Sequence, residues 1–515
     1  MFLKKIKAKN KRNRRSLTRI FASRSSTPDQ PSKPDQPSQL STTNGRQFVL
    51  PYDLLEEIAK YIPRRKAAPL LTVNSQFHDA FARAVWRRLY LDDDRVDRIS
   101  ASAWQTYGHL VRFATVKFYG PHEHLDVVRM PNVIDLTVYL TYRGYNIFEG
   151  AELSNLRRLH LKLPQQGWTS FAAVKGAELA QRVAQPGHPI AVDWDIYAEK
   201  YRHVAALDDL LDPIVDTAPH TFKITAESKH PVTLEQLPKL AEMLTELDLH
   251  HSPFVFDCFL GNSDISFPRL VKLAIGSSCF DEEENDGPVD ANILIPHRFP
   301  VLQRLSFADL SRSDLEWLEV AFSHNWASIS ELAFLDSSSY LEFATIANHV
   351  PNLTRLTVKG YDNSLNINLA AGHWPHLQHL DIDSPVRFQY DASNNPQPQL
   401  TSLKSFIFTT TWSMGQNSIR QQILDFILHG APNLELIELN EGCFHESVLS
   451  MARDQVNLSV RTLSIEIELD RFDAATAKTF IGMFPNLKLL KAKGKDYAAI
   501  QQLKEDHPNL RIQYC

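Results

Sequence analysis

The feature that most constrains the fold is a short apolar frame that recurs from about residue 110 to the end of the chain. Its clearest copies are "PNLTRLTV" at Pro351, "PHLQHLDI" at Pro375, "PNLELIEL" at Pro432 and "PNLKLLKA" at Pro485. The spacing is 24 residues from Pro351 to Pro375 and 23 to Pro398, and it is wider to Pro432. Each copy reads P-x-L-x-x-L-x-apolar, which predicts a turn followed by a strand with alternate side chains inward.

Looser copies of this frame extend the pattern over most of the chain. They are "PNVIDLTV" at Pro131, "SNLRRLHL" at Ser154, "PRLVKLAI" at Pro268, "PVLQRLSF" at Pro300 and "PNLRIQY" at Pro508. Helix-like stretches such as "LEFATIANHV" and "ATAKTFIGMF" lie between copies. One strand and one helix every 22 to 34 residues is typical of leucine-rich repeats. We therefore expect an α/β fold, a curved solenoid with parallel strands on its concave face and helices outside.

The repeats are expected to occupy residues 95–515, with an irregularity near one third of the chain. The frame weakens after Leu163, and the stretch "PGHPIAVDWDIYAEKYRHVAALDDLLDP" predicts a helical insertion around 164–218. At the other end, residues 1–46 combine a basic block with the Pro/Ser-rich "PDQPSKPDQPSQLSTTNG". Such a segment has too few apolar residues to offset its ordering entropy, so we expect disorder there.

The charge is divided unevenly along the chain. The formal net charge is −5, but residues 1–28 hold ten Lys or Arg and no acid. Removing those ten positive charges leaves −15 for the rest, which makes general binding of nucleic acid unfavourable. For the basic block itself three readings stay open: a solvated tail, a nuclear localisation signal and a mitochondrial presequence.

A second pattern, three short helices, precedes the repeats. Leu54, Leu55, Ile58 and Ile62 form one stripe of a helix that begins near Pro51 and stops at Pro63. A second helix runs to about Val73, and Asn74 or Ser75 can cap a third. Three such helices bury little surface by themselves, so the unit is marginal and would gain stability from a partner.

The stretch "LPYDLLEEIAKYIP…LLTVNSQFHDAFARAVWRRLYL" resembles the F-box, which sets the predicted domain at 47–94. Pro69 departs from the family pattern and is expected in the first turn of the second helix. The positions that match the family's pattern are Leu50, Pro51, Leu54, Leu55, Ile58, Ile62, Leu70, Val73, Phe77, Trp86 and Leu89.

The resemblance implies a function. F-box proteins bind the Skp adaptor and through it a cullin–RING ligase, while a C-terminal repeat domain selects a protein substrate for ubiquitination and degradation. It implies adaptor contacts by Leu50, Pro51, Leu54, Leu55, Ile58, Ile62, Val73, Phe77 and Trp86. Two alternatives remain: the helices only cap the first repeat, or the chain is a leucine-rich scaffold or nuclear interaction protein outside any ligase.

Strand alternation predicts which repeat side chains face a protein substrate. The candidates point to the concave face and carry both signs of charge, which indicates a protein surface and not a nucleic-acid site. They are Arg158, His160, Lys162, Glu246, Asp248, His250, Arg355, Thr357, Lys359, His379, Asp381, Asp383, Glu438 and Asn440.

The sequence has no pattern that favours an enzyme, a cofactor or a metal site. Phosphate loops, HExxH and GxSxG are absent, and 18 glycines leave little material for phosphate-binding turns. His250 and His251 near Cys258, or His122 with His124, lack paired cysteines, and "DEEEND" at Asp281 lacks calcium-ligand spacing.

The same reading predicts where the protein acts. Four scattered cysteines favour a reducing compartment. The sequence also lacks a secretory signal and any run of eighteen apolar residues. We expect a non-catalytic protein in the cytoplasm or nucleus, without cofactor, metal, membrane or nucleic-acid partner.

Overall fold

The computed structural model describes most repeats and the N-terminal helices. The described residues are 51–62, 64–96, 98–117, 129–140, 153–163, 169–184, 190–198, 212–226, 237–251, 264–276, 294–308, 314–335, 343–360, 366–368, 374–383, 387–389, 400–409, 417–439, 455–466, 474–493 and 503–514. The chain divides into two compact units, Met1–Leu54 and Leu55–Cys515. The predicted disordered tail, 1–46, and Leu50 lie outside the described residues.

One parallel sheet of 17 strands organises the second unit, and each strand pairs with the next along the chain. Its strands are β1 Arg88–Asp92, β2 Phe113–Lys117, β3 Asp135–Tyr139, β4 Arg158–Leu163, β5 Ala191–Ala198, β6 Thr221–Ala226, β7 Glu246–His251, β8 Lys272–Gly276, β9 Arg304–Ala308, β10 Glu331–Leu335, β11 Arg355–Lys359, β13 His379–Asp383, β15 Ser405–Phe408, β16 Leu436–Leu439, β17 Thr462–Glu466, β18 Leu489–Lys493 and β19 Arg511–Tyr514. A separate pair joins β12 Asn366–Asn368 to β14 Arg387–Gln389.

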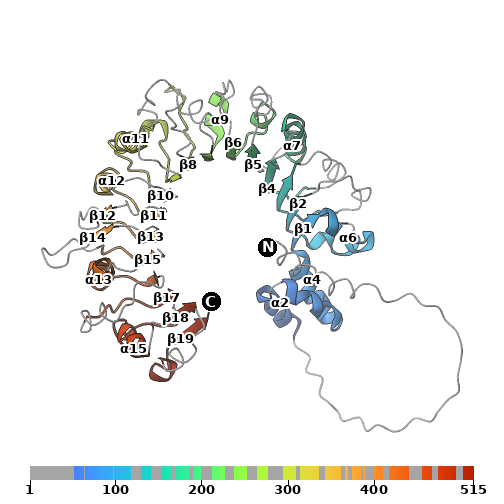
Figure 1. The fold of residues 1–515 in the computed structure, drawn as a ribbon. Coiled ribbons are helices and arrows are strands. Elements are labelled where there is room, and N and C mark those ends of the chain that lie inside the picture. The colour runs from blue at the N-terminus through green and yellow to red at the C-terminus, as the bar shows by residue number, and fades with distance from the viewer. Residues whose placement is uncertain are drawn as a thin grey trace, which may run out of the picture. The chain divides into compact units, whose positions relative to one another are not determined.

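Some helices precede the sheet and others connect its strands; the connecting helices lie on the side of the coils that faces away from the strands (Figure 1). The helices are α2 Tyr52–Tyr61, α3 Arg64–Ala67, η1 Ala68–Thr72, α4 Ser75–Trp86, α5 Asp93–Val96, α6 Ala101–Tyr107, η2 Gly108–Leu110, α7 Thr169–Val183, α9 Leu237–Met243, η7 Pro296–Arg298, α11 Asp314–Ala321, α12 Phe343–His349, α13 Asn417–Asp425, the π-helical η9 Phe426–Gly430 and α15 Ala474–Gly482. Strand, turn, helix and return repeat in order, which confirms the predicted leucine-rich-repeat solenoid fold.

The core is a ladder of apolar side chains, one set from each coil. In β11, Leu356 and Val358 are buried while Arg355, Thr357 and Lys359 alternate with them on the opposite side of the strand. Leu356 lies beside Leu332 of β10 and Leu380 of β13. Each rung therefore buries its surface mainly against neighbouring rungs and the helices behind them, at about 25 cal/mol per Å² of apolar surface.

The asparagine of the "PN" turns links one coil to the previous one, a role that the sequence analysis did not assign. Asn352 Nδ2 donates to the carbonyl of Ala327 over 2.7 Å, and Asn433 Nδ2 donates to that of Thr401 over 2.7 Å. The donor precedes its strand by three residues, and the acceptor precedes the neighbouring strand by four. Other residues that make this contact are Asn132, Asn155, Ser402, Ser459 and Asn486.

The expected helical insertion around 164–218 differs from the structure. It contains α7, but Ala191–Ala198 forms β5 and pairs with both β4 and β6. The ladder shifts here: Trp194 is the fourth residue of β5, yet it lies beside Phe222, the second residue of β6. This shift, together with a preceding sequence that does not fit the P-x-L-x-x-L frame, hides the strand from a search for the frame. Gly176 of α7 lets the helix approach, since a Cβ there would lie 2.7 Å from Trp194 Cη2.

The predicted boundary between the helices and the repeats also differs. β1 is the first strand of the sheet and lies within 47–94, and its Leu89 is buried in the main core. Trp86, at the end of α4, contacts Trp104 edge-to-face at 5.7 Å between ring centroids and stacks on Tyr107 at 5.3 Å. The helices therefore run into the first coil without a separating linker.

Replacing Asn352 by Ala should lower the free energy of unfolding by about 0.5–1.5 kcal/mol, because the Ala327 carbonyl loses its donor. The measurement is the urea unfolding curve followed by circular dichroism. Asn348→Ala, at an exposed position of α12, serves as the control and should cause no loss. Equal effects of the two substitutions would contradict an inter-coil role for Asn352.

Candidate functional site

Two surfaces are candidates for binding a protein. The first is the helical segment, residues 52–86, which comprises α2, α3, η1 and α4. The second is the strand face, formed by the side chains that alternate with the buried rows along β2–β19.

The turns of the helical segment are well determined by their local sequence. Asn74 caps α4 by accepting from the Phe77 N–H over 2.9 Å, as predicted for Asn74 or Ser75. Pro69 falls in the first turn of η1, which confirms its expected place. Arg83 of α4 forms a 2.7 Å salt bridge to Glu56 of α2.

The helical segment has a small core of its own. Its buried residues are Leu55, Ala59, Ala67, Ala80, Phe81 and Ala82. Within the described residues the main core cluster begins at Leu89 and includes none of these six. Four of the six are alanines, so this core gains little free energy from apolar burial.

Large apolar side chains are exposed on the same segment. Ile58 is 36 % exposed and Val73 is 56 % exposed. Of the eleven large apolar side chains that are exposed in the described part of the chain, five lie between Tyr52 and Val73. Apolar side chains gathered in this way are typical of a surface that another molecule covers.

The structure divides the predicted adaptor contacts into two groups. Pro51, Leu54, Ile58 and Val73 are exposed, and Ile62 and Phe77 are half-buried. Leu55 is 1 % exposed and belongs to the small core, so its side chain is not on the surface of the free chain, and its contact with the adaptor stays a prediction. Trp86 is half-buried and packs against the main core, so its ring already has partners within the chain. Some of the predicted contact residues therefore pack within the chain itself, and only the others are exposed to a partner.

The strand face carries pairs of opposite charge that link neighbouring strands. Lys162 of β4 lies 2.9 Å from Asp195 of β5, and Lys223 of β6 lies 3.3 Å from Asp248 of β7. Further pairs are Arg158–Asp193, Lys272–Glu246, Arg304–Glu331 and Lys359–Asp381. A cation whose carboxylate partner is already in contact offers less to a ligand than an unpaired cation.

Asp193 is the electrostatic centre of this face. It is 4 % exposed, accepts a hydrogen bond from Arg158 Nε, and lies 3.1 Å from His160 Nδ1. Burial lowers the pKa of His160, and attraction to Asp193 opposes that effect. Asp193 and Asp195 were not among the predicted residues, although the alternation in "VDWDIY" was a usable signal.

Most of the predicted substrate-facing residues lie in two groups on the strand face; Glu438 belongs to β16, and Asn440 lies outside the described residues. Arg158, His160, Lys162 and Asp248 belong to β4 and β7, and their charges are engaged by neighbouring strands. Arg355, Lys359, His379 and Asp381 belong to β11 and β13, next to one another in the sheet. Burial lowers the pKa of His379 and raises that of Asp381. The side chain of His250 lies outside the described residues.

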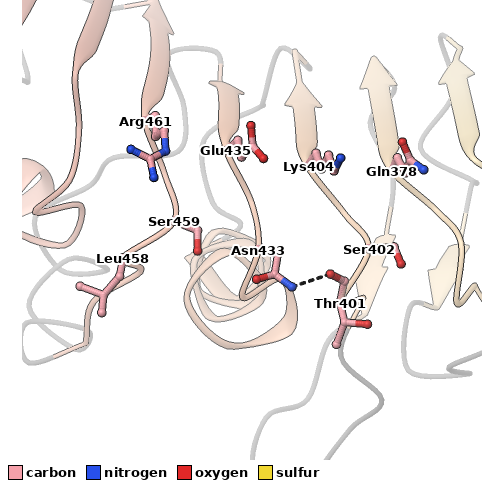
Figure 2. Close-up of a pocket in the computed structure, with 9 residues that line it drawn as sticks. All are labelled: Gln378, Thr401, Ser402, Lys404, Asn433, Glu435, Leu458, Ser459 and Arg461. Atoms are coloured by element: carbon pink, nitrogen blue, oxygen red, sulfur yellow. Dashed lines mark hydrogen bonds between the residues drawn. The ribbon is translucent and has the colours of Figure 1, made fainter.

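A groove runs along the turns that precede β13 to β17. It encloses about 430 Å³. Figure 2 shows Gln378, Lys404, Glu435 and Arg461 in a line at the start of successive strands, with Leu458 and Ser459 at one end. Its lining is mostly polar.

Other kinds of site receive no support from the described residues. Within them, no three His, Cys, Asp or Glu side chains come together as a metal site. The helices of the same described ranges include none with the length and hydropathy of a membrane span. Cys258, His122, His124 and Asp281, named in the sequence analysis, lie outside them.

Comparison with known proteins adds little beyond the fold. No protein-family model matches the sequence, and no curated protein matches it. The crystal structure of a TLR13–ssRNA13 complex is similar, with a TM-score of 0.41 and 12 % identity, over 80 % of this chain and 63 % of that one. The chain thus spans less than two thirds of that protein's length. The leucine-rich repeat domain of APL1B is similar with a TM-score of 0.19 and 11 % identity, over 91 % of this chain and 99 % of that one.

The pKa of His160 should lie below 6.5, because burial disfavours its charged form more than Asp193 favours it. Asp193→Asn should lower this pKa further by removing the attraction. NMR titration of isotope-labelled histidines, assigned with a His160→Gln variant, measures both values. A lowered histidine pKa stabilises the fold at high pH, and this contribution is lost as the pH falls from about 6.5 through the lower pKa of the folded state. A His160 pKa above 6.5 in the native protein would contradict the claim that burial outweighs the attraction to Asp193.

Proposed function

We propose that this chain is the substrate-receptor subunit of an SCF-type ubiquitin ligase, without a catalytic step of its own. The helical segment binds the Skp adaptor, which connects the chain to a cullin–RING ligase. The repeats hold a protein substrate close to the conjugating enzyme, so that ubiquitination and degradation follow from proximity.

The observation that carries this proposal is the exposed apolar surface on a segment with a very small core. Ile58 and Val73 stay exposed while alanines make up most of what is buried behind them. A segment that served only to cap the first repeat would present a polar outer face. The match of this stretch to the F-box pattern supports the adaptor as the partner.

The energetics allow a stable complex only if several side chains are covered. Full burial of an exposed Ile or Val gains about 1.5–3 kcal/mol. Association costs roughly 4–15 kcal/mol in lost freedom, so Ile58 and Val73 need further contacts from the predicted set. The Asn74 cap and the Arg83–Glu56 salt bridge hold the segment in place before binding, which reduces the ordering cost.

The repeats support the second half of the proposal. A leucine-rich-repeat scaffold of this length presents an extended, mixed-charge strand face, which is suited to binding proteins.

The double substitution Ile58→Asp, Val73→Asp should abolish co-purification with the Skp adaptor, because two charges would have to be buried in an apolar interface. Ile58 is partly covered in the free chain, so the unfolding midpoint of the variant is measured beside binding to show that it remains folded. Val301→Asp, at an exposed apolar position in the repeats, is the matched control and should leave adaptor binding intact. If the doubly substituted protein still binds the adaptor, the proposed contact surface is incorrect. If the unaltered protein does not bind it either, the chain acts as a scaffold outside this ligase.

A further inference from the structure

The turn before β17 differs from every clear copy of the repeat frame. Leu458 stands four residues before its strand, where Pro432 and Pro485 stand in the coils on either side. Leu458 is 59 % exposed and Val456 is 51 % exposed. The Leu458 carbonyl still accepts a hydrogen bond from Asn486 Nδ2 over 2.7 Å. The inter-coil link is therefore kept, while an apolar side chain replaces the proline ring.

Asn457, between these two apolar residues, fixes the turn. Its side chain is buried, and Nδ2 donates to the carbonyls of Ile427 and Ala431 over 2.8 and 3.1 Å. Its Oδ1 accepts from the Ser459 N–H over 2.9 Å, and its own N–H donates to the Met483 carbonyl over 2.8 Å. Ile427 belongs to the π-helical turn η9, a local geometry often found at functional sites. Val456 and Leu458 are therefore held outward by a rigid turn, so little entropy is lost when they are covered.

A row of charged side chains lies beside this turn. We call Lys404, Glu435, Arg461 and Lys488 the charged row. Backbone hydrogen bonds place its members side by side: Glu435 N to Lys404 O at 2.8 Å, Arg461 N to Glu435 O at 2.9 Å, and Lys488 N to Arg461 O at 2.9 Å. Adjacent strands are about 4.8 Å apart, so the row spans three such steps.

The cations of the charged row are available to a ligand. All four side chains are exposed, and within the described residues none makes a salt bridge. This contrasts with the strand face, where Lys162, Lys223 and Lys272 already contact carboxylates of neighbouring strands. Three cations against one carboxylate also form a locally basic site on a chain whose residues after 28 carry −15.

The chemistry of this surface points to one kind of partner. Carboxylates of a peptide complement Lys404, Arg461 and Lys488, and an apolar side chain of the same peptide covers Leu458 and Val456. Lys404, Glu435, Arg461 and Leu458 line the groove of about 430 Å³, which provides room for a peptide segment beside them (Figure 2). Single-stranded nucleic acid fits poorly, because bases stack on aromatic side chains and these two are aliphatic. Glu435 in the middle of the row would also repel a phosphate backbone.

We infer that the turn at 456–459 and the charged row together form a docking site for an acidic protein segment that carries an apolar side chain. Under the proposed function, such a segment would belong to the substrate. The site itself lies in the repeats and does not depend on adaptor binding. The ligand of this site is a carboxylate-rich protein segment. Single-stranded nucleic acid is the alternative ligand with which its affinity is compared below.

The test uses the full chain and a fluorescein-labelled 12-residue peptide of Asp and Glu with one central Leu, followed by fluorescence anisotropy. We expect saturable binding that weakens as NaCl rises from 50 to 500 mM, because salt screens exposed charges. Arg461→Ala with Lys488→Ala should weaken binding at least about ten-fold. Leu458→Ser should weaken it about five-fold, and Glu435→Gln should tighten it about three-fold by removing a like charge.

Three controls separate this site from general attraction. Lys272→Ala removes a paired cation elsewhere and should leave the affinity unchanged. The same peptide with Asn and Gln in place of Asp and Glu should not bind. The Ile58→Asp, Val73→Asp protein should bind the peptide normally, which keeps this test independent of the adaptor.

Several outcomes would overturn the inference. They are no binding at 1 mM peptide, equal affinity of the Arg461/Lys488 variant, equal binding of the neutral peptide, or tighter binding of a 12-nucleotide single-stranded RNA. If the unaltered protein binds the peptide but does not bind the adaptor, the result counts against the proposed function only.

Discussion

Pairing between neighbouring parallel strands is the interaction on which the rest of this structure depends. Each coil supplies one short strand and one apolar rung, and alone it buries almost nothing. Leu356 is buried because Leu332 and Leu380 lie on either side of it, and each strand of the sheet between β1 and β19 has a neighbour on both sides in the same way. The Asn352-type links at the turns add a second connection between coils, so the stack is fixed at its strands and at its turns. A surface that needs many coils, such as the charged row, exists only because this stacking sets the register of each strand.

Stacking also decides which surfaces remain for partners. Residues that alternate with the rungs must face away from the core, and on several strands between β4 and β13 their charges contact opposite charges of the next strand. Binding is then expected where the regular pattern of buried apolar residues and paired surface charges is interrupted. It is broken at the helical segment, which adds a few helices with a core of alanines, Leu55 and Phe81 before the first strand. It is broken again at Leu458, where an apolar side chain replaces a turn proline beside cations that make no salt bridge within the described residues.

The repeat frame predicted the fold because the spacing of its apolar residues identifies the buried residues of each strand. The strands at Arg355, His379, Leu436 and Leu489 begin where the proline-marked copies placed them. β5 was missed because the sequence before it does not fit the P-x-L-x-x-L frame and because the ladder shifts by two residues at β6. That Leu55 is buried while Ile58 is exposed was not predictable either. Helical periodicity shows which side chains share a face, but not whether that face contacts the rest of the chain. Asn352 and Asn457 act through carbonyls of other coils, about 25 to 30 residues away, and no local pattern reveals such partners.

The central claim is that a second polypeptide covers the helical segment while the repeats stay free to bind elsewhere. Hydrogen–deuterium exchange of the full chain, alone and with saturating Skp adaptor, tests this most directly. The account predicts slower exchange for amides within 52–86 and unchanged exchange from β2 to β19. Protection in the repeats, or no protection of the helical segment, would contradict it.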